Sequence, residues 1–170
     1  MKLDLKRFAQ QSGGVLPFRL QVDLSDVEWY GARPFTRPVQ VTGEVRDRAG
    51  AMVLTARLET VLSLHCDRCA KPFQREKTVE YETLLAFELA NGENDDIVLL
   101  NADGELELDE LMREVFLLEM DTKNLCSEDC KGLCPGCGAD LNVEQCRCKK
   151  EIDPRWAKLA QLLEQKETDQ

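Results

Sequence analysis

Alternating apolar and polar positions dominate the first half of the chain and predict β-strands. Residues 15–24 and 39–45 each present one apolar face at a period of two. The longest alternations cover residues 54–64 and 79–89. Only a short segment, residues 66–73, separates these two long strands, so we expect a hairpin with that segment at its tip.

The apolar period changes from two to about 3.6 residues after position 100. One helical stripe over residues 108–120 is apolar, and Asp109 and Glu110 stand near its positive N-terminal end. A second helix is predicted from Asp153 and Pro154, because an acidic N-cap followed by proline is a typical helix start. The pattern therefore predicts an α+β fold, an antiparallel β-sheet with two main helices.

The cysteines change this picture, because they gather in two places. Six of eight lie within residues 126–148, and the other two form a pair in the hairpin tip. The N-terminus has no apolar signal core, so we expect a cytoplasmic, reducing environment, where cysteine clusters hold metal more often than disulfides. Thiolates suit the tetrahedral shell of zinc. We predict that two structural zinc ions are bound by Cys66, Cys69, Cys126, Cys130, Cys134, Cys137, Cys146 and Cys148.

The spacing favours one way of sharing these thiols. The four cysteines of residues 134–148 can close one site locally, which costs little loop entropy. Cys66 and Cys69 would then share the second ion with Cys126 and Cys130 and tie the tail to the hairpin. An alternative joins Cys66 and Cys69 to the first two cysteines of 134–148 as a two-knuckle zinc ribbon. In either case residues 1–121 form a β-rich domain, and residues 122–170 a cysteine-rich zinc segment with a C-terminal helix docked on it.

Charge is distributed unevenly along the chain, whose net charge is −10. Residues 82–121 contain one basic residue, Arg113, and 13 acidic residues, a balance of −12. This segment would repel phosphate and attract a basic partner. Basic residues gather instead near the cysteines and would form a nucleic-acid-binding rim, or simply balance thiolate charge. They are Arg68, Lys71, Lys131, Arg147, Lys149 and Lys150.

Nothing in the sequence indicates an enzyme. The only histidine, His65, has no accompanying nucleophile motif, and no phosphate-cradling glycine-rich loop is present. Four thiolates fill the shell of a zinc ion and leave no open position for catalysis. The alternative from another class is an iron or thiol redox or electron-transfer module, since iron also accepts four thiolates. A DNA-binding ribbon is disfavoured by the acidic pI of about 4.7.

Two stretches resemble the YceD family, named for large ribosomal RNA subunit accumulation. Residues 64–73, Leu-His-Cys-Asp-Arg-Cys-Ala-Lys-Pro-Phe, look like its signature. The tail resembles the cysteine-rich branch of the same family, through residues 130–142, Cys146 and Cys148, and the Asp-Pro-Arg-Trp of 153–156. The order of the parts also agrees, from a β-rich front through the hairpin and helix to the tail.

The resemblance implies a non-enzymatic role in the accumulation of 23S rRNA and in large ribosomal subunit assembly. It implies two kinds of partner, precursor rRNA and a basic large-subunit ribosomal protein such as bL32, and no membrane or small-molecule substrate. Some branches of the family keep the first cysteine pair but lack the tail cysteines. The site within residues 134–148 would then stabilise this branch in particular.

Overall fold

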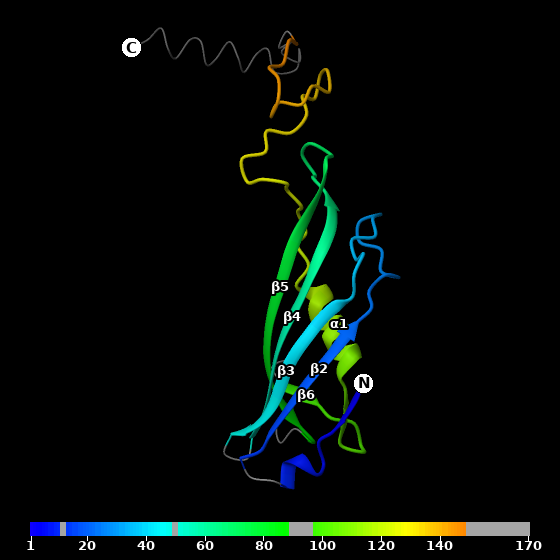
Figure 1. Cartoon of the computed structure of the whole chain (residues 1–170), viewed down its shortest axis with the longest axis vertical. Helices are drawn as coiled ribbons and strands as arrows, with labels where there is room; N and C mark the ends of the chain where they lie inside the picture. Colours follow the sequence, from blue (N-terminus) through cyan, green and yellow to red (C-terminus); the bar gives the residue numbers. More distant parts are fainter. Residues whose placement is uncertain (11–12, 49–50, 89–96, 149–170) are drawn as a thin grey trace, which may run out of the picture.

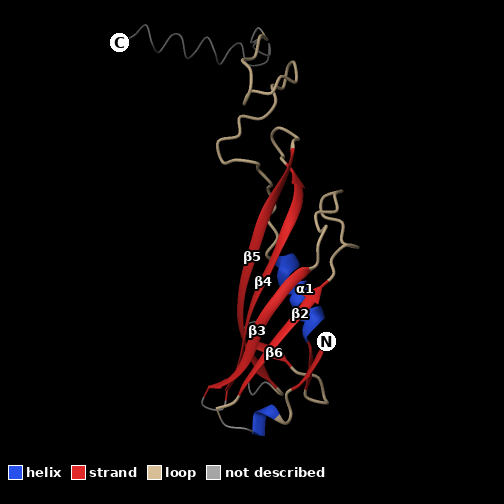
Figure 2. Ribbon diagram, in the orientation of Figure 1, coloured by secondary structure: helices blue, strands red, loops and turns tan. Residues whose placement is uncertain are grey.

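A long twisted sheet with a hairpin projecting from it organises the protein (Figures 1 and 2). The computed structural model describes residues 1–10, 13–48, 51–88 and 97–148. Five strands form the main sheet in the order β2-β3-β4-β5-β6. Their bounds are β2 Val15–Val22, β3 Val39–Arg48, β4 Ala51–His65, β5 Pro72–Ala86 and β6 Ile97–Leu99.

The predicted hairpin is the longest feature of the sheet. β4 and β5 pair antiparallel from Met52 with Leu85 to His65 with Pro72. Along β4 the even positions from Leu54 to Leu64 face the core, except the half-buried Thr60, as the period of two predicts. β3 pairs with β4 only as far as Glu59, so the last residues of the hairpin extend beyond the sheet and hold its tip away from the core.

Two strand pairings differ from a simple antiparallel sheet. β6 runs parallel to β5, with Ile97 beside Leu84, so the predicted wholly antiparallel sheet is wrong at this edge. A short apolar segment indicates a strand but does not encode the direction in which that strand pairs with its neighbour. A separate two-stranded sheet joins β1, Lys2–Asp4, to β7, Glu105–Glu107.

One α-helix covers the core face of the sheet in the described part of the chain. α1 spans Leu108–Leu118, where the apolar stripe predicts it, and buries Leu108, Met112, Val115 and Phe116. Phe116 meets Phe35 edge to face, with ring centroids 6.0 Å apart. The second predicted helix, from Asp153, lies outside the described residues. No helix of the described ranges is long and apolar enough to cross a membrane.

Candidate metal centres

The tip of the β4–β5 hairpin is a tight knuckle. Ala70 donates its N–H to the Cys66 carbonyl at 2.8 Å, and Cys66 donates its own to the Lys71 carbonyl at 2.9 Å. Ala70 takes up a left-handed conformation, with φ of +56°. This reversal within a few residues brings Cys66 and Cys69 to the same side of the turn, and both are buried.

The chain after α1 is attached to this knuckle by specific contacts. Asp67 and Asn124 exchange two hydrogen bonds, one of 2.8 Å between backbone groups and one of 2.6 Å from Asn124 N–H to the Asp67 carboxylate. Lower on β5, Arg75 donates to the Leu125 carbonyl at 2.7 Å and pairs with Asp121 at 3.3 Å. These contacts deliver the next residues of the chain, among them two cysteines, to the knuckle.

The first tetrad comprises Cys66, Cys69, Cys126 and Cys130, whose sulfur atoms all lie within 4.8 Å of one another. Sulfur atoms are 3.8 Å apart between Cys66 and Cys130 and 3.7 Å apart between Cys69 and Cys126. A tetrahedron of thiolates around zinc, with Zn–S bonds of about 2.3 Å, has edges of about 3.8 Å. Three of the four thiols are buried and Cys126 is exposed. The donor set and spacing therefore fit a closed four-thiolate metal site.

The second tetrad comprises Cys134, Cys137, Cys146 and Cys148, again within 4.8 Å of one another. Cys134 sulfur lies 3.1 Å from that of Cys146 and 3.9 Å from that of Cys148. A second knuckle supports it, because Gly138, with φ of +74°, donates its N–H to the Cys134 carbonyl at 2.8 Å. Only Cys134 is buried, so this site stands at the surface.

Both tetrads combine one acidic thiol with others that resist ionisation. Burial opposes ionisation of Cys66, but backbone N–H groups of Cys126, Cys69 and Arg68 outweigh it and lower its pKa to about 6. Hydrogen bonding from Cys146 and backbone N–H groups lowers the pKa of Cys134 to about 6 as well. Desolvation and the neighbouring thiols raise the pKa of Cys126 to about 12. Clustered thiolates repel one another, and a bound cation removes that penalty.

A short bridge connects the two tetrads into one unit, which we call the head. Leu133 donates its N–H to the Arg68 carbonyl at 3.0 Å, which holds the second knuckle against the first. Gly132, with φ of +76°, permits this approach: a Cβ there would lie 2.9 Å from the Arg68 carbonyl oxygen. The Asn142 side chain reaches back to the first tetrad, donating to Cys130 sulfur at 3.5 Å and accepting from Lys131 N–H at 2.7 Å.

The structure gathers the thiols in the way that local loop closure favours. No group in the described residues combines Cys66 and Cys69 with Cys134 and Cys137, as the alternative ribbon requires. Sequence reasoning missed Asp140 and Asn142, which brace the bridge between the tetrads. The sequence does carry a signal for them, because Asp and Asn two residues apart are typical of an Asx turn. In the structure Asn142 donates its N–H to the Asp140 side chain at 3.0 Å in such a turn.

The basic residues of the predicted rim divide into three groups. Arg68 and Lys71 make their contacts within the head: Arg68 donates to the Cys130 carbonyl at 2.7 Å, and Lys71 pairs with Asp140 at 2.5 Å. Lys131 and Arg147 are exposed and make no ion pair with any described residue. Lys149 and Lys150 lie outside the described residues. His65 is exposed on β4 and belongs to neither tetrad.

The fold and site define a class of protein, a β-hairpin scaffold whose tip and tail together form a cysteine-rich head with two potential metal sites. Comparison with known proteins then identifies the family. The large ribosomal RNA subunit accumulation protein YceD family matches residues 54–163, which include the hairpin, α1 and both tetrads. The chain belongs to this family.

Several curated proteins are similar to this chain at moderate sequence identity. An uncharacterized protein of Mycobacterium tuberculosis is 35% identical over 101 residues, which cover 58% of this chain and 49% of the relative. One from Mycobacterium leprae is 30% identical over 148 residues, covering 85% and 65%. A chloroplastic YCED homolog 1 of Zea mays, named for large ribosomal RNA subunit accumulation, is 29% identical over 150 residues, covering 70% and 51%. The chain thus spans about half to two thirds of these relatives. No solved structure gave a significant match.

Proposed function

We propose that this chain is a non-enzymatic factor in the accumulation of 23S rRNA and in large ribosomal subunit assembly. Family membership supports the rRNA role. The observation that carries the mechanism is the convergence of eight thiols, from the hairpin tip and the tail, in one head. A head built from closed four-thiolate sites has the chemistry of a rigid binding platform, because such sites leave no coordination position for a substrate.

Zinc is the metal that we assign to both tetrads. All eight cysteines of the two tetrads act as ligands in this proposal, four to each ion. Bound zinc supplies cross-links whose binding energy becomes folding energy of the head. Elemental analysis of protein purified under reducing conditions should find two zinc ions per chain in a colourless sample. A red or brown sample containing iron would favour the redox alternative instead.

A basic ribosomal protein fits one exposed face of the molecule. Glu110 and Glu114 on α1, and Glu119 at its end, make no ion pair with a described cation, and Leu118 beside them is 84% exposed. Such an acidic surface with an apolar residue within it complements a basic chain of the bL32 kind. Precursor rRNA fits other surfaces of the head, where Lys131 and Arg147 are exposed. The proposed partners are therefore precursor rRNA, a basic large-subunit ribosomal protein, or both.

Depletion and capture together test this function. Depleting the protein in cells should lower mature 23S rRNA relative to 16S rRNA, and restoring the wild-type chain should reverse the loss. Unchanged 23S rRNA on depletion would contradict the proposal. Capture of the tagged protein before and after nuclease treatment then separates the partners. A ribosomal precursor lost after digestion indicates an RNA contact, whereas a basic protein retained after digestion indicates a protein contact.

A further inference from the structure

The connection between β2 and β3 rises beside the upper part of the hairpin (Figure 1). It first takes the place of a neighbouring strand, since Ser63 donates its N–H to the Pro34 carbonyl at 2.9 Å and Phe35 bridges to Leu62. Nearer the tip, this edge of β4 has no further bridge to a described residue. A hollow of about 590 Å³ opens there, which we call the upper hollow. Its lining includes Arg33 from the connection, Ser63 and His65 from β4, and Phe73 and Gln74 from β5.

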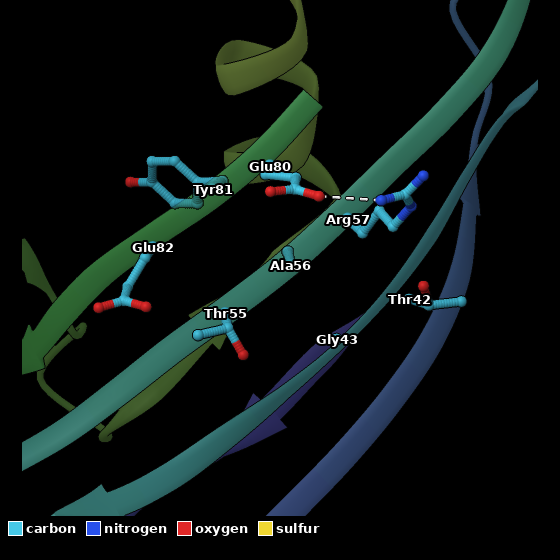
Figure 3. A pocket seen from close by; sticks show the side chains of 8 residues that line it. All are labelled: Thr42, Gly43, Thr55, Ala56, Arg57, Glu80, Tyr81 and Glu82. Carbon is cyan, nitrogen blue, oxygen red and sulfur yellow. Dashed lines mark hydrogen bonds and ion pairs between the residues drawn. The ribbon is translucent and has the colours of Figure 1, made fainter. Parts of the chain in front are cut away.

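The upper hollow is unusual in its charge. No acidic side chain lines it, although the chain carries a net charge of −10. The hollow over the middle of the sheet is different, because its lining includes Glu80 and Glu82 as well as Arg57, and Glu80 pairs with Arg57 at 2.9 Å (Figure 3). Arg33 is exposed and makes no ion pair with a described residue. The upper hollow therefore suits an anion.

Asp26 is the carboxylate whose pKa is affected by the charge of Arg33, but it does not form an ion pair with this arginine. Asp26 has a lowered pKa, chiefly through its hydrogen bonds to Arg113 and only to a small extent through the charge of Arg33. The Asp26 carboxylate is held by Arg113 at 2.9 Å. Asp26 is thus already paired with another arginine, and the guanidinium of Arg33 can meet a ligand.

A strained turn displays an aromatic ring beside the upper hollow. Trp29 and Ala32 exchange backbone hydrogen bonds of 2.8 and 3.1 Å around the two-residue turn of Tyr30 and Gly31. Both turn residues have positive φ, +49° for Tyr30 and +76° for Gly31, where asparagine and glycine are usual and a large side chain is disfavoured. The Tyr30 side chain is nevertheless 75% exposed. Strained backbone is concentrated at functional sites, so an exposed aromatic ring on the strained residue Tyr30 indicates a binding role.

We infer that the upper hollow binds single-stranded RNA. A phosphate lies at Arg33 and His65, a base contacts the Phe73 wall near Gln74 and Ser63, and the next base stacks on Tyr30. A small anion would account for the unpaired Arg33 but not for Phe73 and the neighbouring Tyr30 ring, whereas an unpaired nucleotide uses both the charge and the rings. The inference rests on the proposed function for the choice of RNA, and it uses none of the six basic residues of the predicted rim.

Direct binding of a labelled ten-nucleotide oligouridine to the zinc-loaded full chain tests the inference. Tyr30→Asn, which relaxes the turn while removing the ring, should weaken binding about tenfold. Arg33→Ala should weaken it and reduce the slope of log Kd against log salt by about 0.7, as loss of one phosphate contact requires. The matched control is Arg37→Ala, which removes the same charge from the same connection at a residue outside the upper hollow. It should leave both quantities unchanged.

A local readout separates the upper hollow from other surfaces. In a Trp156→Phe background Trp29 is the one remaining tryptophan, and its ring lies 5.4 Å from the Tyr30 ring, so its fluorescence should change as oligouridine binds. Equal losses from Arg33→Ala and Arg37→Ala, an unchanged Trp29 signal, or equal competition by polyglutamate would overturn the inference. If oligouridine does not bind but depletion still lowers 23S rRNA, the upper hollow is refuted and the proposed function stands. Binding at the upper hollow without any effect of depletion would instead support the site and refute the proposed function.

Discussion

The two tetrads use the same four-thiol chemistry in different structural roles. The first joins residues far apart in sequence, since Cys69 and Cys126 are separated by 57 in residue number, and three of its four thiols are buried. The second closes locally, since Cys137 and Cys146 are separated by only nine in residue number, and three of its thiols are exposed. With a metal ion bound, the same donor set would act as a tertiary cross-link in one place and as a local staple in the other.

The difference in sequence separation between the two tetrads corresponds to a difference in the free energy of loop closure. Closing the longer loop costs about 1.6 kcal/mol more than closing the shorter one, from (3/2)RT ln n with these separations. Contacts outside the thiols offset that cost, namely the Asp67–Asn124 hydrogen bonds and the Arg75–Leu125 hydrogen bond. The comparison teaches that the first tetrad depends on the hairpin being folded, whereas the second depends mainly on its own turn.

Replacing one cysteine pair at a time should have the largest effect. Cys66→Ser with Cys69→Ser should reduce zinc from two ions per chain to one and expose residues 121–130 to protease, because the tail loses its attachment to the hairpin. A structural zinc site is worth on the order of 10 kcal/mol, so the change should be complete under ordinary buffers. Zinc stoichiometry and limited proteolysis measure the two effects.

The matched variant is Cys134→Ser with Cys137→Ser. It should also lose one ion but leave residues 121–130 protected, since the first tetrad is intact. Retention of two ions by either double variant would show that the thiols are not shared as the structure groups them.

Metal removal should follow the burial of the thiols. A chelator should extract zinc in two phases, the faster at least about tenfold quicker, because a surface site admits the competing ligand without opening of the head. A colorimetric zinc indicator can follow release from the reduced protein. The two double-cysteine variants identify the phases: the Cys66/Cys69 variant should show only fast release and the Cys134/Cys137 variant only slow release. A single phase in the wild type would contradict the difference in burial.

Two glycines with similar φ angles test the bridge between the tetrads. Gly138→Ala should cost about 1 kcal/mol, the usual penalty for a side chain in the left-handed region, because its Cβ would meet nothing within 4 Å. Gly132→Ala should cost clearly more, since its Cβ would press on the Arg68 backbone. Thermal melting at fixed free zinc measures both. Equal shifts would mean that the close contact at Arg68 does not hold the tetrads together.

The Lys71–Asp140 ion pair should contribute least. Hydrogen bonding from Lys71, followed by that from Asn142, lowers the pKa of Asp140 to about 2, below its ordinary value of 3.8. A lowered pKa in the folded state means that the pair stabilises the head above about pH 4 and loses this effect as the pH falls toward 2. Asp140→Asn should therefore lower the melting temperature slightly at pH 7. Asp129→Asn, at an exposed residue without an ion pair in the described chain, should not.

Much of the scaffold could be predicted because its signals are local. The alternation of residues 54–64 and 79–89 predicted the hairpin, and β4 and β5 confirm it, although Phe87 lies beyond the end of β5 and is 43% exposed. The apolar stripe from Leu108 likewise predicted α1. Side-chain period follows from backbone geometry within each element, so it requires no knowledge of distant residues.

Other features arose only from tertiary contacts. The parallel direction of β6 and the pairing of β1 with β7 depend on where the chain returns, which periodicity does not encode. For Arg68 and Lys71 the sequence left two interpretations open, a nucleic-acid contact or a balance of thiolate charge. The folded head adds contacts that neither interpretation included: Arg68 donates to the Cys130 carbonyl and Lys71 pairs with the Asp140 carboxylate. Charge alone could not distinguish these uses.

The sequence by itself determined which atoms are available to bind metal, since cysteine type and spacing define a thiol donor set and make local closure of residues 134–148 the less costly arrangement. Only the tertiary structure decided that Cys126 and Cys130 meet the hairpin tip, and that Arg33 and His65 share a hollow free of carboxylates. The physical reason is the range of the interactions: spacing and propensity act over a few residues, whereas these sites are assembled from segments brought together by packing and by hydrogen bonds across the fold.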